Sequence, residues 1–286
     1  MTTRPRTKEE YQKQINIIVE YICNHLDEAI DTGLLAEMSG FSPWHFHRIM
    51  KAFLGEPIGA FILRKRLETA ARLLRYTDLP ITDITYHIGY ETPSSLSKQF
   101  RQFYDISPNG YRNNKNYVIM KPEQINPNLC IDGPTIKTLS PQPVIYIRLS
   151  GAYMNNDYCA AWKKLWRFVQ EQKLFCPNMQ HICIYHDDPK VTEPDKLHTD
   201  VCLTLDHLPT PKGEIGAKTI EEGKYAIFKY KGPYNNLSAV YDMIYSQLLP
   251  TNGYRIGTSS GYENYLNNPG DTAPENLLTE IYIPIE

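Results

Sequence analysis

Residues 42–53 read SPWHFHRIMKAF, and this stretch decides the fold of the first half of the chain. Wound as an α-helix, it places four apolar side chains on one face, namely Phe46, Ile49, Met50 and Phe53. Ser42 followed by Pro43 is typical of a helix N-terminus, because Ser can cap free backbone N–H groups and Pro suits the first helical position. The opposite face has no acidic residue and consists of Trp44, His45, His47, Arg48 and Lys51.

The composition of this outer face indicates what it could bind. His45 and His47 are two residues apart, so they diverge on a helix, whereas zinc-binding helical histidines are spaced i, i+4. We therefore expect no metal site here. Indole, imidazole and guanidinium groups on a helix free of acidic residues favour a polyanion with planar edges, such as double-stranded DNA.

The same helical pattern recurs 50 residues later, in PSSLSKQFRQFY at residues 93–104. Leu96, Phe100 and Phe103 are predicted to point inward. The predicted outer face is again free of acidic residues and carries Ser94, Ser95, Ser97, Lys98 and Arg101. Two such helices on one chain could enter successive segments of the major groove, about 34 Å apart. The alternative is an all-helical bundle that contains two similar hairpins.

Residues 8–113 resemble the DNA-binding domain of AraC-family transcription regulators. The resemblance rests on the SGFSPWHFHRIMKAF segment, the RKRLETAARLL helix predicted over residues 58–76, and the GYETPSSLSKQFRQFYDISPNGYR segment. It implies that Trp44, His47 and Arg48 face bases in one groove, and that Ser95, Ser97 and Lys98 do so in the next. Met50 departs from the family, which usually has Phe at this position. Pro93 also departs, because many members have a polar residue there.

Composition limits the class of protein. The chain has 286 residues, is 42% hydrophobic and has a net charge of −2, which fits two globular domains. Residues 1–120 carry 15 basic and 13 acidic side chains, and the remainder carries 15 basic and 19 acidic side chains, which indicates different partners for the two halves.

The six Cys residues are scattered, no apolar run reaches about 20 residues, and the N-terminus lacks a signal-peptide core. We expect a cytoplasmic protein with free thiols, no cofactor, no bound metal and no membrane association.

The second half of the sequence has a repeat of its own. After a polar, Pro-containing linker predicted over residues 114–128, a strand–helix–strand–strand order occurs twice. Aligning Pro189 with Pro269 also aligns Tyr185 with Tyr265 and Cys183 with Glu263. We predict an all-α double helix-turn-helix domain over residues 1–113. An α+β domain with a duplicated βαββ unit is predicted over residues 129–286, with helices on one side of the sheet.

The alternation of apolar and polar residues predicts which side chains share a sheet face. It places Tyr146, Arg148, Asp200, Glu280 and Tyr282 on the face away from the helices, and we expect Glu263 to join them. Carboxylates beside tyrosine rings would suit a hydrophobic cation through charge and cation–π attraction. The alternative for Asp200 is an ion pair with Arg148. Trp162 is a further candidate contact, although its i, i+4 spacing from Trp166 is typical of core packing.

Residues 129–286 resemble the GyrI-like effector-binding domain, through KGPYNNLSAVYDMIYSQLLPTNGY and GYENYLNNPGDTAPENLLTEIYIPI. The resemblance implies a ligand cleft between two pseudo-symmetric halves, with Glu263 and then Glu280 as acidic anchors. The whole chain thus resembles Rob-like regulators, in which DNA binding comes first and effector binding second. Some relatives of this domain are hydrolases.

The predicted function is therefore a bacterial transcription regulator, not an enzyme. Its predicted partners are double-stranded DNA and a small-molecule effector, with RNA polymerase as a further candidate. The alternative is a ligand-sequestering protein or a hydrolase activity in the second domain, although no nucleophile with a base beside it is visible in the sequence.

Overall fold

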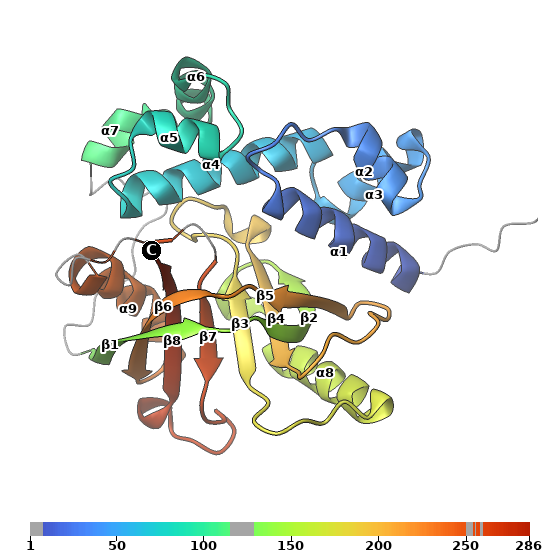
Figure 1. Ribbon diagram of the computed structural model, residues 1–286, viewed down its shortest axis with the longest axis vertical. Coiled ribbons are helices and arrows are strands. Elements are labelled where there is room, and N and C mark those ends of the chain that lie inside the picture. The colour runs from blue at the N-terminus through green and yellow to red at the C-terminus, as the bar shows by residue number, and fades with distance from the viewer. Residues whose placement is uncertain (1–7, 115–128, 250–253, 255, 258–259) are drawn as a thin grey trace, which may run out of the picture. The chain divides into compact units, whose positions relative to one another are not determined.

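The computed structural model describes residues 8–114, 129–249, 254, 256–257 and 260–286, and Figure 1 shows the course of the chain. The chain divides into two compact units. The helices up to residue 114 belong to the first unit, and the whole sheet belongs to the second. Beyond Asn114, the predicted linker lies outside the described residues. The predicted fold class, a helical domain followed by an α+β domain, is confirmed.

Seven helices make up the described part of the first unit. They are α1 (Lys8–Asn24), α2 (Thr32–Ser39), α3 (Pro43–Leu54), α4 (Ile58–Tyr76), α5 (Ile81–His87), α6 (Pro93–Tyr104) and α7 (Pro108–Asn113). The bounds of α4 match those predicted from the sequence. α3 and α6 each span 12 residues and begin with Pro, which agrees with the predicted 50-residue repeat.

The ends of α3 and α6 follow the same local rules. Ser42 and Thr92 are the N-cap residues, and Thr92 accepts a hydrogen bond from the Ser95 N–H at 3.2 Å. Ser42 makes no such cap bond, and its hydroxyl instead contacts Nδ1 of His45 at 3.0 Å. Both helices end at a residue in the left-handed conformation, Gly55 in one and Asp105 in the other, which stops further helix growth.

α4 lies between two hydrophobic cores. One core joins α1, α2 and α3 to the beginning of α4, with Ile58 and Phe61 fully buried. On the other side, the rings of Phe100, Tyr104 and Tyr111 pack together, and α5, α6 and α7 contact α4. The two helix-turn-helix units therefore do not share one core; each packs on its own part of α4.

The sequence prediction for Phe53 and Phe103 was wrong. Both were expected to face inward, but their side chains are 40% and 43% exposed. They occupy equivalent positions in the last turn of α3 and α6, where the next residue of each helix, Leu54 or Tyr104, packs on the core instead. An amphipathic pattern gives the direction of a side chain but not where the opposing surface ends.

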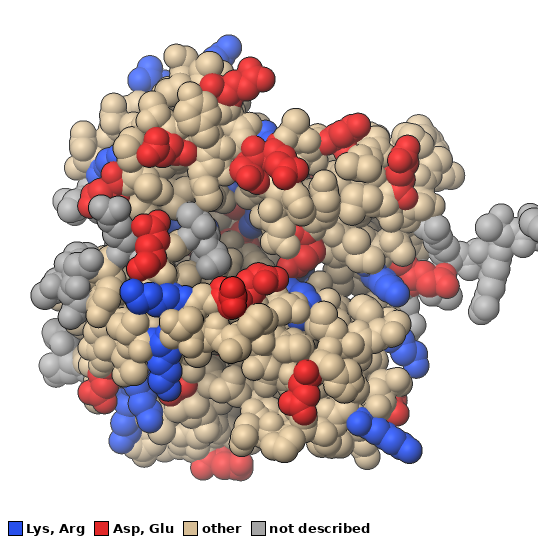
Figure 2. All heavy atoms as spheres, viewed as in Figure 1, with Lys and Arg blue, Asp and Glu red and all other residues tan. Residues whose placement is uncertain are grey.

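The second unit is built on one antiparallel sheet of eight strands in the order β1-β6-β8-β7-β3-β4-β2-β5 (Figure 1). The strands are β1 (Cys130–Leu139), β2 (Gln142–Ser150), β3 (His181–Tyr185), β4 (His198–Thr204), β5 (Gly216–Ile220), β6 (Gly223–Lys231), β7 (Tyr262–Tyr265) and β8 (Leu278–Ile285). β1 and β5 were not predicted individually, and they form the two edges. Figure 2 shows basic side chains gathered where β1 and β6 lie. The exposed lysines of these two strands include Lys137 on β1 and Lys229 and Lys231 on β6. Lys137 lies on the edge strand β1, where a lysine disfavours pairing with another sheet.

Helical segments connect the strands. The helix of the first predicted strand–helix–strand–strand unit is α8 (Tyr158–Gln172). The helix of the second is α9 (Leu237–Met243), which is followed by a π-helical turn, η4 (Ile244–Leu248). Short 3₁₀ turns complete the described part of this unit, namely η1 (Tyr153–Asn155), η2 (Pro194–Lys196), η3 (Tyr234–Asn236) and η5 (Pro274–Asn276).

The duplication predicted from the sequence is visible in the hydrogen bonds of the loops. The N–H of Gly151 donates to the Leu197 carbonyl, and the N–H of Gly232 donates to the Leu277 carbonyl in the same way. Likewise Asp187 accepts from the His198 N–H, and Asn267 accepts from the Leu278 N–H. The two repeats meet at the middle of the sheet, where β3 pairs with β7 and Cys183 lies opposite Glu263.

Candidate DNA-contacting helices and effector-binding cluster

The outer face of α3 is exposed as the sequence indicated. Trp44, His45, His47, Arg48 and Lys51 all lie at the surface. The Arg48 guanidinium stacks on the Trp44 ring, with its carbon 4.5 Å from the ring centre, so the two side chains form one flat surface. Such a surface combines a planar hydrogen-bond donor with an apolar ring, and these are the groups that read base edges in a major groove.

The outer face of α6 is less aromatic and richer in hydroxyl groups. Ser94, Ser95, Lys98 and Arg101 are exposed, and Ser97 is half-buried. The Ser95 hydroxyl lies 2.8 Å from the Thr92 hydroxyl, so the N-cap of the helix holds it in place. The arrangement resembles that of α3 in charge, because both faces are basic and neither carries an acidic side chain within its helix.

Glu263 was expected on the same sheet face as Tyr146, Arg148, Asp200, Glu280 and Tyr282, and that placement was wrong. Ile145 and Ile147 of β2 pack against α8, and Ile281 and Ile283 of β8 pack against α9, which defines the helix face. Glu263 pairs with Ile281 across one neighbouring strand and with Cys183 across the other, so it shares their helix face.

The opposite face holds the remaining candidates. Tyr146 and Tyr282 lie there in one buried cluster. Arg148 and Glu280 are two residues away from them along the same strands, so their side chains point to the same face. Trp162, on α8, packs on the helix face with Glu263 instead. The set therefore splits into Glu263 and Trp162 on one side of the sheet and Tyr146, Arg148, Glu280 and Tyr282 on the other.

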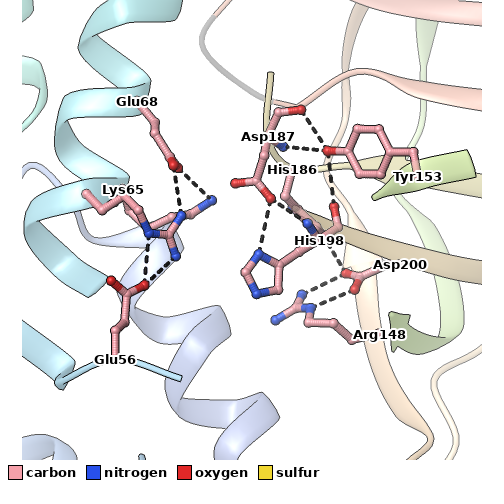
Figure 3. A network of polar contacts seen from close by, with 10 residues as sticks. Glu56, Lys65, Glu68, Arg148, Tyr153, His186, Asp187, His198 and Asp200 are labelled. Carbon is pink, nitrogen blue, oxygen red and sulfur yellow. Dashed lines mark hydrogen bonds and ion pairs between the residues drawn. The ribbon is translucent and has the colours of Figure 1, made fainter. Parts of the chain in front are cut away.

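Arg148 forms an ion pair with Asp200, which is the alternative that the sequence analysis considered for Asp200. Its guanidinium makes two hydrogen bonds of 2.7 Å to the two carboxylate oxygens of Asp200, which is fully buried (Figure 3). His186 and Lys218 also contact Asp200, each at 2.7 Å. Burial alone would raise the pKa of Asp200, but the charges of Arg148 and Lys218 outweigh it and hold this pKa well below its usual range. This network is a structural anchor between strands.

Glu280 lies in a different setting from its repeat mate Asp200. Its carboxylate accepts hydrogen bonds from the Tyr282 hydroxyl at 2.8 Å and from the Asn264 amide at 3.3 Å. Tyr282 in turn stacks on Tyr262, with ring centres 4.4 Å apart. The side chain of Glu280 is half-buried, so water can screen its charge.

Glu263 is surrounded by aromatic residues from both repeats. The tyrosine cluster around it consists of Tyr153, Tyr185, Tyr234, Tyr241 and Tyr265. The Tyr265 hydroxyl donates to Glu263 Oε2 at 2.6 Å and lies 2.8 Å from the Tyr185 hydroxyl. The edge-to-face contacts are symmetric, since Tyr153 packs on Tyr185 at 4.8 Å and Tyr234 packs on Tyr265 at 5.3 Å. Trp162 adds a sixth ring, 5.6 Å from that of Tyr265.

The electrostatic setting of Glu263 is the reverse of that of Asp200. Its carboxyl group is only 1% exposed, and no Lys, Arg or His among the described residues forms an ion pair with it. Burial raises the pKa of Glu263 from 4.5 to about 7, although hydrogen bonds from Tyr265, Tyr241 and Tyr185 lower it in part. Near neutral pH this side chain is therefore close to the midpoint between its neutral and charged forms.

The internal repeat shows that the carboxylate is not needed for the architecture. The position equivalent to Glu263 is Cys183, whose side chain is fully buried in the neighbouring strand. Burial raises the pKa of the Cys183 thiol well above its usual value, so the thiol stays protonated. One repeat thus places a neutral group, and the other a titratable group, at the same point of the fold.

Sequence reasoning identified Glu263 but missed most of the residues around it. Tyr185 and Tyr265 were aligned by the repeat, yet neither was assigned to the site. Tyr153 and Tyr234 also occupy equivalent positions, in the turns after Gly151 and Gly232, and a search for aromatic residues shared by both repeats would have found them. Tyr241 on α9 lacks such a signal, because its contact depends on how the helix packs.

The described residues can be searched for a metal site and for a membrane-spanning helix. Among them, no three His, Cys, Asp or Glu side chains form a group that could hold a metal ion. Among the helices described, none combines the length and the apolar character needed to span a bilayer.

Comparison with known proteins agrees with both halves of this description. The GyrI-like small molecule binding domain family matches residues 133–286, and a helix-turn-helix domain family matches residues 35–114. Regulatory protein SoxS of Salmonella typhimurium is 33% identical over 102 residues, which are 36% of this chain and 95% of SoxS. The transcriptional activator AarP of Providencia stuartii is 32% identical over 98 residues, 34% of this chain and 73% of AarP. A solved EcmrR–DNA complex is 18% identical, covers 89% of this chain and 98% of that one, and has a TM-score of 0.43.

The chain belongs to the GyrI-like small-molecule-binding family, and its first unit is an AraC-type helix-turn-helix domain. It is therefore a DNA-binding transcription regulator that carries a small-molecule-binding domain.

We expect Asp200→Asn to destabilise the second unit strongly. The substitution leaves Arg148 and Lys218 without the charge that neutralises them in a buried site, which should cost about 3–5 kcal/mol. Because the folded-state pKa of Asp200 is lowered, its contribution is present above the ordinary Asp pKa and is lost as the pH falls through the folded-state value. Urea denaturation at neutral pH measures the loss. Glu280→Gln, at the equivalent position, should cost under about 1 kcal/mol; equal losses would contradict the assignment.

Glu263 should make the stability of the second unit depend on pH in the opposite sense. Between pH 4.5 and 7 the folded protein keeps a proton on Glu263 that the unfolded chain releases, so stability should decline as the pH rises through this range. The full effect is on the order of 3 kcal/mol and should be absent in Glu263→Gln. Urea denaturation at pH 5 and pH 8, followed by the fluorescence of Trp162 and Trp166, tests this. Parallel pH profiles of wild type and variant would refute it.

Proposed function

We propose that this regulator responds to a hydrophobic cation bound at Glu263 and the tyrosine cluster. The proposal assigns residues 1–113 to DNA binding and residues 129–286 to effector binding. The observation that carries it is a fully buried carboxylate without a cationic partner among the described residues. Its surroundings consist of tyrosine rings and hydroxyl groups supplied by both repeats.

The energetics of Glu263 favour a positively charged ligand. An ionised carboxylate in a buried site is unfavourable unless an opposite charge or hydrogen bonds compensate for the lost hydration. Here tyrosine hydroxyls compensate in part, and the raised pKa of about 7 reflects what is left. A bound cation would supply the missing charge, while the faces of Tyr and Trp rings attract cationic groups further. A neutral ligand would gain neither contribution.

DNA binding is assigned to the outer faces of α3 and α6. The proposed contacts are those predicted from the sequence, Trp44, His45, His47, Arg48 and Lys51 on α3 and Ser94, Ser95, Ser97, Lys98 and Arg101 on α6. What supports them is their exposure, their basic character and the stacking of Arg48 on Trp44. Arg48 is the first choice for a base contact, because a stacked guanidinium keeps its donors free for a base edge.

Hydrolysis is the less favoured alternative. A Cys nucleophile requires a lowered pKa, whereas burial raises the pKa of the Cys183 thiol beside Glu263. We therefore propose a binding site and not a catalytic one. RNA polymerase, a further partner considered from the sequence, has no contact assigned among the described residues, and the proposal is limited to DNA and an effector.

Arg48→Ala and Lys51→Ala should have different effects on DNA binding. If Arg48 reads a base edge, its loss should cost about 1–3 kcal/mol on the preferred site and relax preference at one position. Lys51→Ala should weaken binding to all sequences alike and flatten the salt dependence, as expected for a phosphate contact. Selection of bound duplexes from a random library, followed by titrations at several salt concentrations, measures both. Unchanged base preference in Arg48→Ala would rule out the base contact.

Glu263→Gln should weaken a hydrophobic cation by about 2–3 kcal/mol, while Glu280→Gln should weaken it by under about 1 kcal/mol. Tetraphenylphosphonium and related hydrophobic cations serve as probes in calorimetric titrations of the full chain. The two variants test rival anchors, one on each face of the sheet. If Glu280→Gln had the larger effect at matched stability, the effector site would lie on the opposite face.

Cation binding at Glu263 should also release protons. Below pH 7 the site is mostly protonated, so a cation must displace a proton, and affinity should rise with pH until the pH exceeds about 7. Titrations in two buffers of different ionisation enthalpy count the released protons. A cation that binds with the same affinity from pH 5.5 to 8, and without proton release, would not be using this carboxylate.

A further inference from the structure

Within the helical domain, the first half (α1–α3) and the second half (α5–α7) contact each other at a polar junction beside α4. Arg66, in the middle of α4, donates from Nε to the Leu26 carbonyl at 3.0 Å and from Nη2 to the Glu28 carbonyl at 2.6 Å. These carbonyls belong to the segment between α1 and α2, in the first half. The same guanidinium lies 6.0 Å from the ring centre of Tyr90, in the second half.

Gly89 completes the junction from the second half of the helical domain. It lies in the turn between α5 and α6 and has a positive φ of 73°. A Cβ atom at this position would lie 2.4 Å from the Leu26 carbonyl oxygen and 2.7 Å from Arg66 Nη2. The turn that leads into α6 is therefore in direct contact with the segment that leads into α2, and a larger residue would force them apart.

The junction lies where it can determine how α3 and α6 are placed relative to each other. Each half of the helical domain packs its own core on a different part of α4, so the cores alone do not fix the angle between the halves. α4 has 19 residues and spans about 28 Å, which is close to the distance of one helical turn of DNA. A small change in twist or bend along α4 would displace α6 relative to α3 by several times more than it moves the junction.

We propose that Arg66 is a positioning residue that sets the spacing of the two recognition helices, and hence the spacing of the two DNA half-motifs that one chain selects. The inference rests on the proposed function of α3 and α6. Arg66 need not touch DNA. Its two hydrogen bonds hold the α1–α2 segment, and its guanidinium and Gly89 hold the α5–α6 turn against that segment.

The test compares spacing preference in the full chain and in Arg66→Met, which keeps a long apolar side chain but loses both hydrogen bonds. Both proteins select bound duplexes from one random library, and the spacing between the two half-motifs is counted. We expect wild type to select one spacing. In Arg66→Met the preference for this spacing over its neighbours should fall by about five- to tenfold, with unchanged base preference inside each half-motif.

Arg112→Met is the matched control. Arg112 also donates from its guanidinium to a backbone carbonyl, that of Leu79 at 2.6 Å, but both residues lie in the second half of the domain. It should lower the melting temperature by a similar amount and leave the spacing preference intact. Arg66→Lys keeps the charge but has one donor nitrogen in place of the two that Arg66 uses, so its spacing preference should fall between those of wild type and Arg66→Met. Arg66→Lys serves as the test variant if Arg66→Met does not fold.

The outcomes separate this inference from the proposed function. If wild type selects two half-motifs and the Arg66 variants select the same single spacing, the inference is overturned while DNA reading by α3 and α6 stands. The same holds if Arg112→Met broadens the spacing as much as Arg66→Met does, because general destabilisation would then explain both. If wild type selects no sequence at all, the proposed function fails together with the inference.

Discussion

The antiparallel pairing of β3 with β7 is the constraint on which the second unit depends. It joins two repeats that would otherwise be separate half-sheets, and it places Cys183 of one repeat opposite Glu263 of the other. Helices from both repeats then cover the same face of one continuous sheet. The point where the repeats meet is thus the one place that both can line with side chains. The carboxylate at this point is therefore surrounded by equivalent residues of the two repeats, namely Tyr185 and Tyr265, and Tyr153 and Tyr234.

Much of the fold could be predicted because periodicity and repetition are recorded in the sequence. The bounds of α4 and the 50-residue offset between α3 and α6 follow from apolar spacing and from Pro and Gly at fixed positions. The exposure of Phe53 and Phe103 could not be predicted in this way. In each helix the apolar stripe is wider than the face that is buried, and the packing of the other helices determines that Leu54 and Tyr104 face the core while Phe53 and Phe103 do not.

The sheet face on which Glu263 lies could not be predicted from the sequence for a different reason. In β3 and β7 the neighbours of this position on both faces are largely apolar or aromatic, so hydrophobic alternation offers no contrast from which to assign a face. Strand pairing resolves what alternation cannot, because Glu263 must share a face with Cys183 and Ile281. An error of one residue in parity moved the expected anchor to the wrong side of the sheet, where Asp200 and Glu280 lie.

Two buried carboxylates in one sheet show how the neighbouring groups determine the pKa of a buried acid. Asp200 and Glu263 are both removed from water, which by itself raises the pKa of each. Arg148 and Lys218 reverse this effect at Asp200, so its charge is already compensated and a ligand would have to displace them. At Glu263 tyrosine hydroxyls compensate only in part, so part of the cost of ionisation remains and the pKa of this carboxyl group is about 7. Under the proposed function a bound cation would remove this cost, whereas the neutral Cys183 thiol at the equivalent position carries none.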